Sequence, residues 1–177
     1  MNNFDTIVAP ATPMIESSIS VIRLSGEKAF AIAENVFRKK SGKEINIPET
    51  ASHTVHFGII ADGEDIIDEV LITVFKNPNS YTGEDVIEIS SHGGVFITRK
   101  ILSLLISKGA RSAEPGEFTK RAFLNGKLDL SQSEAVADLI KSQTDSAHRS
   151  SLKQLEGTLS KFISEARNDL LNAISLV

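Results

Sequence analysis

The chain has 177 residues, of which 41% are hydrophobic, a profile typical of a globular protein with an ordinary core. Its formal net charge of −4 excludes the strongly basic overall footprint of many nucleic-acid-binding domains. The chain has no cysteine, which excludes disulfide bonds and thiolate metal sites, and no apolar run is long enough to predict a membrane span. We therefore expect a cytoplasmic protein with no membrane association.

The N-terminal part of the chain mixes β-rich runs with helical spacing. Strands are predicted at 6–9, 19–24, 54–61, 66–75 and 85–90, and the turn 62–65 predicts a hairpin. One helix is predicted to follow Ser25, read as its N-cap, and to include Phe37. Another is predicted from Val95 to Ser107, before Gly109. These connections predict an α+β fold, with a mixed or antiparallel sheet and helices on a face.

The C-terminal part is helical by pattern from Glu117 onward. Ser131 and Glu134 form a capping-box pattern that predicts the start of one long helix. An apolar stripe with helical spacing then runs from Leu152 to Val177. A stripe of this length must be buried against another segment, so we expect the beginning of a helical domain that is truncated here. The expected domains are 1–118 and 119–177.

Three charged side chains are candidate ligand contacts. Glu88 is either a solvent-facing carboxylate or an acceptor for two parallel N–H groups, such as those of a 2-amino-4-oxo pyrimidine ring. Arg23 has apolar neighbours and is either a salt-bridge partner at the edge of the core or a cation for a ligand. Lys127 lies in a turn between predicted helices, and by pattern alone it is a surface lysine. Glu84 is expected on the same strand face as Glu88.

His92 and the basic run 99–127 each allow two interpretations, whereas His53 and His56 allow one. His92 is either held by the backbone of a turn or lines a pocket at a strand end. His53 and His56 are expected on opposite faces of a strand, so no metal site is predicted. Seven Lys and Arg residues between Arg99 and Lys127 are opposed by only two Glu, which indicates either a solvated helix surface or an anion-binding face.

Several longer blocks carry a family resemblance that covers nearly all of the chain. These blocks are Asp5–Ala9, Val21–Gly26, Ile67–Leu71, Ser80–Ile89 with His92–Gly94, Ala113–Leu130 and Glu134–Ile140. In this order they resemble the N-terminal region of the MnmE/TrmE tRNA uridine modification GTPases. The resemblance implies an aminomethyltransferase-like folate-binding and dimerisation domain, followed by the start of a helical domain into which a GTPase domain is inserted in the family.

The resemblance also implies a cofactor, partners and site residues. The expected ligand is 5-formyltetrahydrofolate or another tetrahydrofolate derivative, contacted by Arg23, Glu88 and Lys127. GTP, Mg²⁺ and K⁺ would belong only to the GTPase domain, which this chain lacks, and no catalytic residue is assigned within it. The expected partners are a second copy, an MnmG-type flavoprotein and tRNA. With the flavoprotein, the family adds an aminomethyl-type group to carbon 5 of the wobble uridine.

One departure from the family pattern keeps other functions open. The loop after Ala11-Thr12-Pro13 has no glycine between Met14 and Ser20, although the family has one there and glycine permits close backbone approach to a ligand. The alternatives are a dimerisation scaffold whose ligand site has decayed and a stand-alone folate-dependent aminomethyltransferase-like enzyme.

We predict that the 177-residue chain does not hydrolyse GTP. The phosphate-binding pattern G-x-x-x-x-G-K-[ST] is absent, because Gly42-Lys43 and Gly126-Lys127 both lack the earlier glycine and the following Ser or Thr. The check is phosphate release from GTP by purified protein with Mg²⁺ and K⁺ present. Turnover above that of a mock purification would contradict the prediction.

Overall fold

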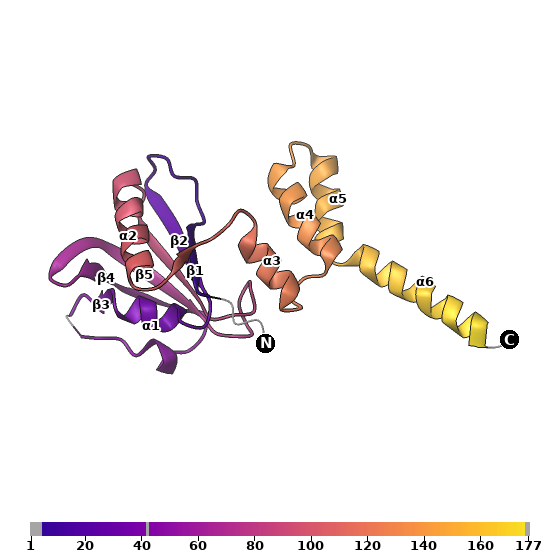
Figure 1. The fold of residues 1–177 in the computed structure, drawn as a ribbon. Helices are drawn as coiled ribbons and strands as arrows, with labels where there is room; N and C mark the ends of the chain where they lie inside the picture. Colours follow the sequence, from indigo (N-terminus) through magenta and orange to yellow (C-terminus); the bar gives the residue numbers. More distant parts are fainter. Residues whose placement is uncertain (1–4, 42, 176–177) are drawn as a thin grey trace. The chain divides into compact units, whose positions relative to one another are not determined.

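The structure is a computed structural model that describes residues 5–41 and 43–175. The chain divides into two compact units, Met1–Phe118 and Thr119–Val177 (Figure 1). The first unit contains the sheet, and the second is helical. The predicted α+β class, a mixed sheet with helices followed by an all-α segment, is confirmed.

Within the described residues, the first unit is built on a seven-stranded sheet with the order β3-β4-β5-β6-β2-β1-β7. The strands are β1 Ile7–Pro10, β2 Ile19–Ser25, β3 Phe37–Lys39, β4 Thr54–Asp62, β5 Asp65–Phe75, β6 Val86–His92 and β7 Arg111–Ser112. Strands β1 and β7 pair in parallel, and the other pairs are antiparallel. Strands β4 and β5 form the predicted hairpin, and Gly63 adopts a φ of 62° in its turn.

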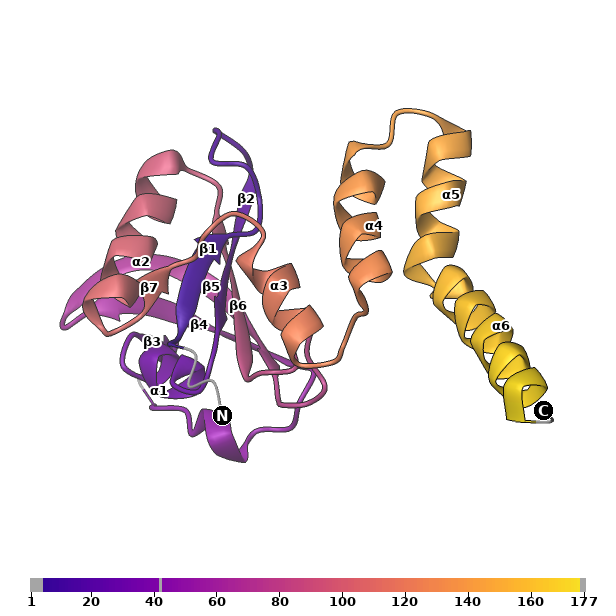
Figure 2. The same cartoon turned by 45° about the vertical axis from the view of Figure 1, so that its right-hand side comes forward.

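Helices α1 (Ala29–Glu34) and α2 (Val95–Ser107) pack on one face of this sheet (Figures 1 and 2), and a short 3-10 helix η1 covers Ile47–Glu49. The buried cluster between these layers includes Ile22, Leu24, Ile72, Ile87, Ile89, Phe30, Ile101 and Leu105. Each fully buried side chain of this kind stabilises the fold by about 1.5–3 kcal/mol. Helix α2 matches its predicted bounds, and Gly109 follows it with a φ of 108°.

Two predictions around the first helix were wrong. Ser25 is not an N-cap, because it is the last residue of β2 and its hydroxyl contacts Thr82 and Glu84. Helix α1 begins only at Ala29. Phe37 is not helical either: it begins β3 and pairs with Ile60. Phe37 is 1% exposed in β3, and an apolar residue on the core side of a helix would be buried as well, so helical spacing alone could not distinguish the strand from the helix.

The sequence patterns also missed two strands and misplaced two residues. Strands β3 and β7 are three and two residues long, too short to show alternation. His53 precedes β4 in a left-handed conformation with a φ of 63°, so it does not share a strand with His56. Glu84 lies in the turn before β6, and the predicted strand-face relation between Glu84 and Glu88 is therefore wrong.

Three helices make up most of the second unit. After α3 (Glu117–Leu124), which spans the boundary, come α4 (Leu130–Lys141), α5 (Asp145–Leu155) and α6 (Thr158–Ser175). Helices α4 and α5 run antiparallel (Figure 2). The side-chain Nε2 of Gln154 donates to the backbone carbonyl of Ser131 over 3.0 Å. The side-chain Nε2 of Gln132 donates to the backbone carbonyl of Leu155 over 2.8 Å. The start of α4 is therefore tied to the end of α5.

The capping box that opens α4 is not the predicted one. Asp129 is the N-cap: its side chain accepts from the backbone N–H of Gln132, and the Gln132 side chain accepts from the backbone N–H of Asp129. Ser131 and Glu134 lie inside the helix. Asp129 has extended backbone angles, φ −85° and ψ 176°, so the first helical residue is Leu130.

The predicted long helix is wrong as well, because the helical segment is interrupted twice. Thr144 caps α5, and Gly157 has a φ of 77° between α5 and α6. The apolar stripe is therefore divided between two helices, and its last residue, Val177, lies outside the described residues. Large hydrophobic side chains of α6 remain exposed, among them Phe162 at 68% and Leu170 at 65%.

We predict that Asp129 makes the second unit sensitive to acid. The hydroxyl of Ser160, on α6, donates to Asp129, and this bond and then the N–H of Gln132 lower the pKa of Asp129. A carboxyl whose folded pKa is lowered stabilises the fold above its unfolded pKa of about 3.9 and loses that contribution as the pH falls through the folded pKa. The difference in unfolding free energy between wild type and Asp129→Asn should therefore shrink between pH 7 and pH 3. The measurement is urea unfolding followed by helical circular dichroism, and a difference that stays constant over this range contradicts the prediction.

Candidate ligand site on the open sheet face

The two faces of the sheet differ because side chains alternate along each strand. One face carries the buried core under α1 and α2. On the other, which we call the open face, the cross-strand registers place residues in two adjacent rows. One row contains Val21, Ser90, Leu71 and Phe57, and the other contains Arg23, Glu88, Thr73 and Val55.

Arg23 and Glu88 form an ion pair on the open face. They are direct cross-strand partners in the β2–β6 register. The Arg23 Nε donates to Glu88 Oε1 over 2.9 Å, and Nη2 donates to the same oxygen over 2.7 Å. Both side chains are 25% exposed. The structure thus brings together two of the three predicted site residues, in a setting where water only partly screens the charges.

Two aromatic rings hold the guanidinium of Arg23. Its central carbon lies 5.1 Å from the ring centroid of Tyr81 and 5.6 Å from that of Phe118. Both distances are within the range of cation–π attraction. Pattern reasoning did not single out Tyr81 or Phe118, since an isolated aromatic residue in a turn or at a helix start carries no positional signal. The rings restrict the motion of Arg23 and so support the position of the pair.

The turn before β6 is tied to the end of β2 by a buried network. The hydroxyl of Ser25 lies 2.8 Å from that of Thr82 and donates to Glu84 Oε2 over 2.6 Å. Asp85 accepts from the backbone N–H of Asn77 over 2.9 Å. Glu84 and Asp85 are therefore engaged in holding the turn that carries Tyr81, whereas Glu88 lies on the open face.

A groove of about 290 Å³ lies beside the ion pair on the same face. Its lining residues are Ser18, Ile19, Phe57, Glu69, Val70, Leu71, Ser90, Ser91 and His92. His92 thus lines a hollow at the strand end, and its Nδ1 lies 2.7 Å from Asp68 Oδ1. Because Ser90 is two residues from Glu88 on β6, the groove and the carboxylate are neighbours along one strand.

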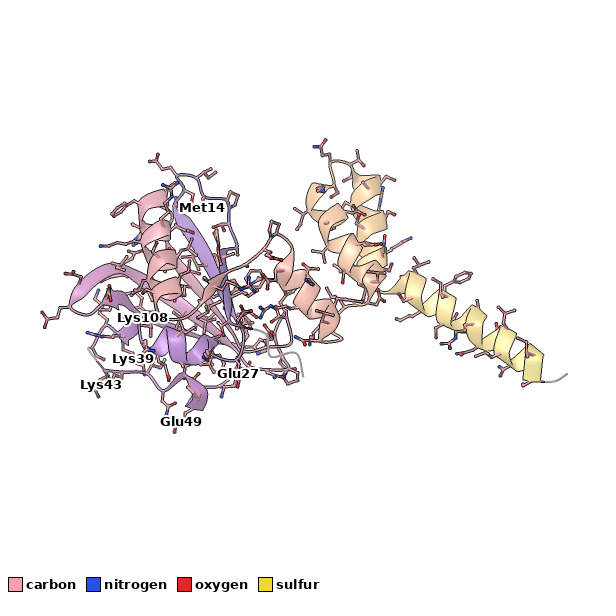
Figure 3. All side chains as sticks on the ribbon, viewed as in Figure 1. Met14, Glu27, Lys39, Lys43, Glu49 and Lys108 are labelled. Atoms are coloured by element: carbon pink, nitrogen blue, oxygen red, sulfur yellow. The ribbon has the colours of Figure 1, made fainter. Side chains whose placement is uncertain are left out.

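The glycine-free loop between β1 and β2 packs on the turn that follows β6; Figure 3 labels Met14 in this loop. The backbone N–H of Ser17 donates to the carbonyl of Gly93 over 3.1 Å. A Cβ atom on Gly93 would lie 2.3 Å from the carbonyl oxygen of Ser17, so only glycine fits there without a shift. The close backbone approach in this region is therefore provided by Gly93.

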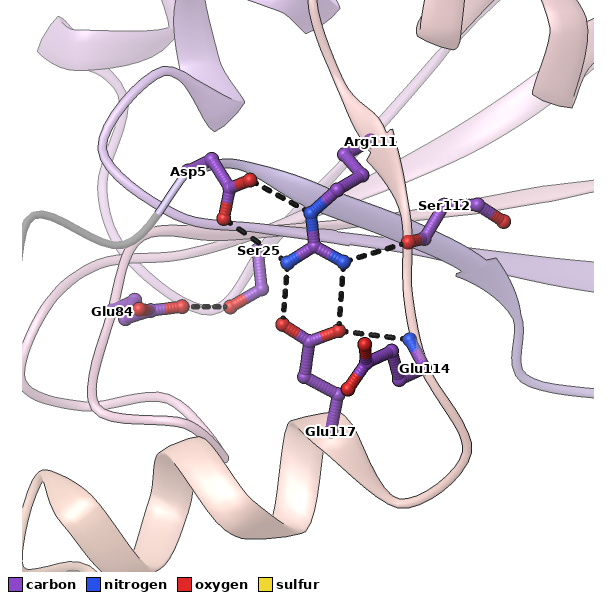
Figure 4. A network of polar contacts seen from close by, with 7 residues as sticks. All are labelled: Asp5, Ser25, Glu84, Arg111, Ser112, Glu114 and Glu117. Atoms are coloured by element: carbon purple, nitrogen blue, oxygen red, sulfur yellow. Dashed lines mark hydrogen bonds and ion pairs between the residues drawn. The ribbon is translucent and has the colours of Figure 1, made fainter.

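Arg111, within the basic run 99–127, has a structural role in the first unit (Figure 4). Its guanidinium donates to the carboxylates of Asp5 and Glu117 and to the carbonyl of Ser112, with distances between 2.7 and 3.1 Å. The hydrogen bonds to Asp5 and then Glu117 raise the pKa of Arg111. Since these contacts use the N–H donors of the fork, Arg111 is not available to a bound anion.

The third predicted site residue, Lys127, belongs to the second unit. It is exposed in the turn between α3 and α4, and its backbone N–H donates to the carbonyl of Ala122 over 2.8 Å. Among the described residues, no group of three or more His, Asp or Glu side chains is arranged to hold a metal ion. The helices in the described ranges include none with the length and apolar character needed to cross a bilayer.

Comparisons with known proteins assign the two parts of the chain to one family. Residues 6–127 match the family described as the GTP-binding protein TrmE N-terminus, and residues 130–177 match the MnmE helical domain. The chain belongs to the MnmE/TrmE family of tRNA modification GTPases. The family boundary, between 127 and 130, falls slightly after the structural boundary at Phe118, so α3 is counted with the N-terminal family domain.

Relatives of the MnmE/TrmE family match almost the whole chain. The tRNA modification GTPase MnmE of Clostridioides difficile is 54% identical over 173 residues, and that of Flavobacterium psychrophilum is 52% identical over 173 residues. That of Lactococcus lactis subsp. cremoris is 48% identical over 174 residues. Each alignment covers 98% of this chain but 37% of the relative. The chain therefore spans little more than a third of the length of these relatives.

Proposed function

We propose that this chain is the N-terminal part of a tRNA-modifying enzyme, and that its sheet unit binds a tetrahydrofolate derivative and forms a homodimer. Family membership supports the tRNA modification role, since the relatives named above are tRNA modification GTPases. The observation that carries the folate proposal is the partly buried Arg23–Glu88 pair on the open face. A carboxylate and a planar cation are the groups that recognise a heterocycle with N–H donors and a carbonyl.

The proposed reaction belongs to the longer protein. With an MnmG-type flavoprotein, the enzyme adds an aminomethyl-type group to carbon 5 of the wobble uridine in tRNA. In this proposal the reduced folate, 5-formyltetrahydrofolate or a related derivative, occupies the place of the one-carbon donor. GTP, Mg²⁺ and K⁺ belong to the GTPase domain, and the proposed location of the enzyme is the cytoplasm.

The proposed site residues have different tasks. Glu88 accepts from N–H groups of the pterin ring, and Arg23 supports it from β2. Lys127 is proposed as a cation for ligand carboxylates, and its exposure predicts a smaller contribution because water screens the charge. The close contact of Ser17 with Gly93 supports this proposal over a decayed scaffold, since the backbone beside the groove remains well packed without a glycine in the loop.

We predict that Glu88→Ala weakens binding of 5-formyltetrahydrofolate by roughly 10- to 150-fold. Removal of the carboxylate leaves buried N–H groups of the ligand without an acceptor. A hydrogen bond to a charged group contributes about 1.5–3 kcal/mol. Isothermal titration calorimetry measures the change in Kd. Glu64→Ala, at an exposed position in the β4–β5 turn, is the matched control and should bind like wild type. Equal affinities for wild type and Glu88→Ala would disprove the acceptor role, and no binding by wild type would favour the scaffold.

We predict that the chain is a dimer that the open face helps to form. Apolar side chains there are exposed, with Phe57 at 49% and Val55 at 58%, and contiguous exposed apolar area marks interaction surfaces. Phe57→Asp should give a monomer in sedimentation velocity at tens of micromolar. Phe96→Asp, at a 75% exposed position on α2, should stay dimeric. A wild-type monomer at high micromolar concentration contradicts the dimer, and a dimeric Phe57→Asp contradicts the role of the open face.

A further inference from the structure

We propose that Arg111 is a positioning residue for ligand binding on the open face. Its guanidinium holds Glu117, the first residue of α3, and the ring of the next residue, Phe118, lies against Arg23. Arg111 acts on the ligand through the placement of this ring and not by direct contact. The affinity part of the inference rests on the proposed function, because it takes a reduced folate as the ligand.

The start of α3 is fixed by a tight turn over residues 114–117. The backbone N–H of Glu117 donates to the carbonyl of Glu114 over 3.1 Å, and Gly116 has a φ of 75°. With Pro115 at the second position, this is the pattern of a type II turn, in which the third residue needs a positive φ. Glu117 Oε2 also accepts from the backbone N–H of Glu114 over 2.8 Å. The Glu117 carboxylate is therefore part of the turn that starts the helix.

Arg111 binds this carboxylate at two points (Figure 4). Its Nη1 donates to Glu117 Oε2 over 3.1 Å, and its Nη2 donates to Oε1 over 2.7 Å; we call this contact the clamp. Asp5 anchors the guanidinium as well, over 2.7 Å from Nε and 3.0 Å from Nη2. The Glu117 side chain is only 10% exposed. Removal of Arg111 would thus take a cation away from a mostly buried carboxylate, which would then gain hydration by moving outward.

The sheet register places the clamp close to Arg23. Arg111 is the partner of Ile7 on β1, and Ile7 is the partner of Ser25 on β2. Arg23 lies two residues before Ser25, so its side chain is on the same face of the sheet. Strands β7 and β2 are separated by one strand, which corresponds to about 10 Å. The clamp and Arg23 therefore lie in neighbouring rows of the open face, within reach of one helix start.

Contacts of two adjacent residues fix both the position and the rotation of the first turn of α3. Successive side chains of a helix point about 100° apart, so Glu117 reaches Arg111 on β7 while Phe118 reaches Arg23 on β2. Without the clamp, the helix start can turn, and the Phe118 ring moves away from the guanidinium. Arg23 then gains conformational freedom that ligand binding must remove, which lowers the affinity.

The affinity test titrates 5-formyltetrahydrofolate by calorimetry into variants of the full 177-residue chain. Arg111→Gln should weaken binding by roughly 3- to 10-fold, the effect of a lost positioning contact. In a Phe118→Ala background the same substitution should weaken binding by less than about twofold, because the ring through which Arg111 acts is already gone. Arg111→Lys keeps the cation without the two-point contact and should fall between wild type and Arg111→Gln. Arg99→Gln, at an exposed position on α2, should bind like wild type.

A second readout needs no ligand. The Nε–H of Arg23 is identified in ¹⁵N NMR spectra by its absence in Arg23→Lys. This N–H should exchange with water at least about threefold faster in Arg111→Gln than in wild type. Faster exchange would support the positioning role even if wild type bound no folate, a result that would overturn the proposed function and the affinity prediction with it.

Different outcomes overturn the two steps of the inference. A folded Arg111→Gln with wild-type exchange at Arg23 and wild-type affinity overturns the positioning role. An affinity loss that is equally large in the Phe118→Ala background overturns the route through the ring and shows a general effect on the fold. If circular dichroism shows that Arg111→Gln does not fold, Arg111→Lys in both backgrounds decides by the same comparisons.

Discussion

The candidate site depends on the antiparallel register between β2 and β6. Side chains alternate along a strand, so a slip of one residue would exchange the two faces. Ile22 pairs with Ile89, and Leu24 with Ile87, and all four are fully buried on the core face. Burial of these apolar side chains fixes the register, and the register then sets Arg23 opposite Glu88 on the open face. The core and the site are thus two consequences of one pairing.

This origin explains how two charged groups persist in the middle of a sheet. Desolvation of an ion pair often costs as much as the charges gain, and such a pair is weak evidence for stability. The pair here is held by neighbours that are fixed by other contacts. Tyr81 lies in the turn that the Ser25–Thr82–Glu84 network holds, and Phe118 lies in α3, whose first residue, Glu117, is bound by Arg111. The site is therefore largely preorganised, which lowers the entropic cost of binding a ligand.

Local patterns predicted the long elements of the sheet unit because their signals are repeated many times. The β4–β5 hairpin has alternation on both strands and a glycine turn, and α2 has helical spacing and a glycine after its end. The patterns did not predict β3, whose three residues show no period, or the use of Ser25, whose hydroxyl bonds to groups 57 and 59 residues away. In the second unit, the pattern did not distinguish Asp129 from Ser131 as the N-cap of α4, because the two positions are only two residues apart and the sequence fits a cap at either one.

The site also combines features that local patterns indicate with contacts between residues far apart in the sequence. Arg23 and Glu88 could be singled out one at a time from residue type and neighbours, but their contact spans 65 residues and follows only from the strand register. The resemblance to the family placed both residues, with Lys127, in a folate site, and it did not indicate that Arg23 and Glu88 bind each other. Tyr81 and Phe118 were identified as site residues only from the contacts of their rings with the Arg23 guanidinium in the structure.

The central claim is that Arg23 and Glu88 act as one recognition unit. A double-mutant cycle on affinity for 5-formyltetrahydrofolate, with Arg23→Ala, Glu88→Ala and the double variant, tests it most directly. The claim predicts that the double variant loses little more affinity than Glu88→Ala alone, with a coupling free energy of about 1–3 kcal/mol. Losses that add to within about 0.5 kcal/mol would show two independent contacts and contradict it.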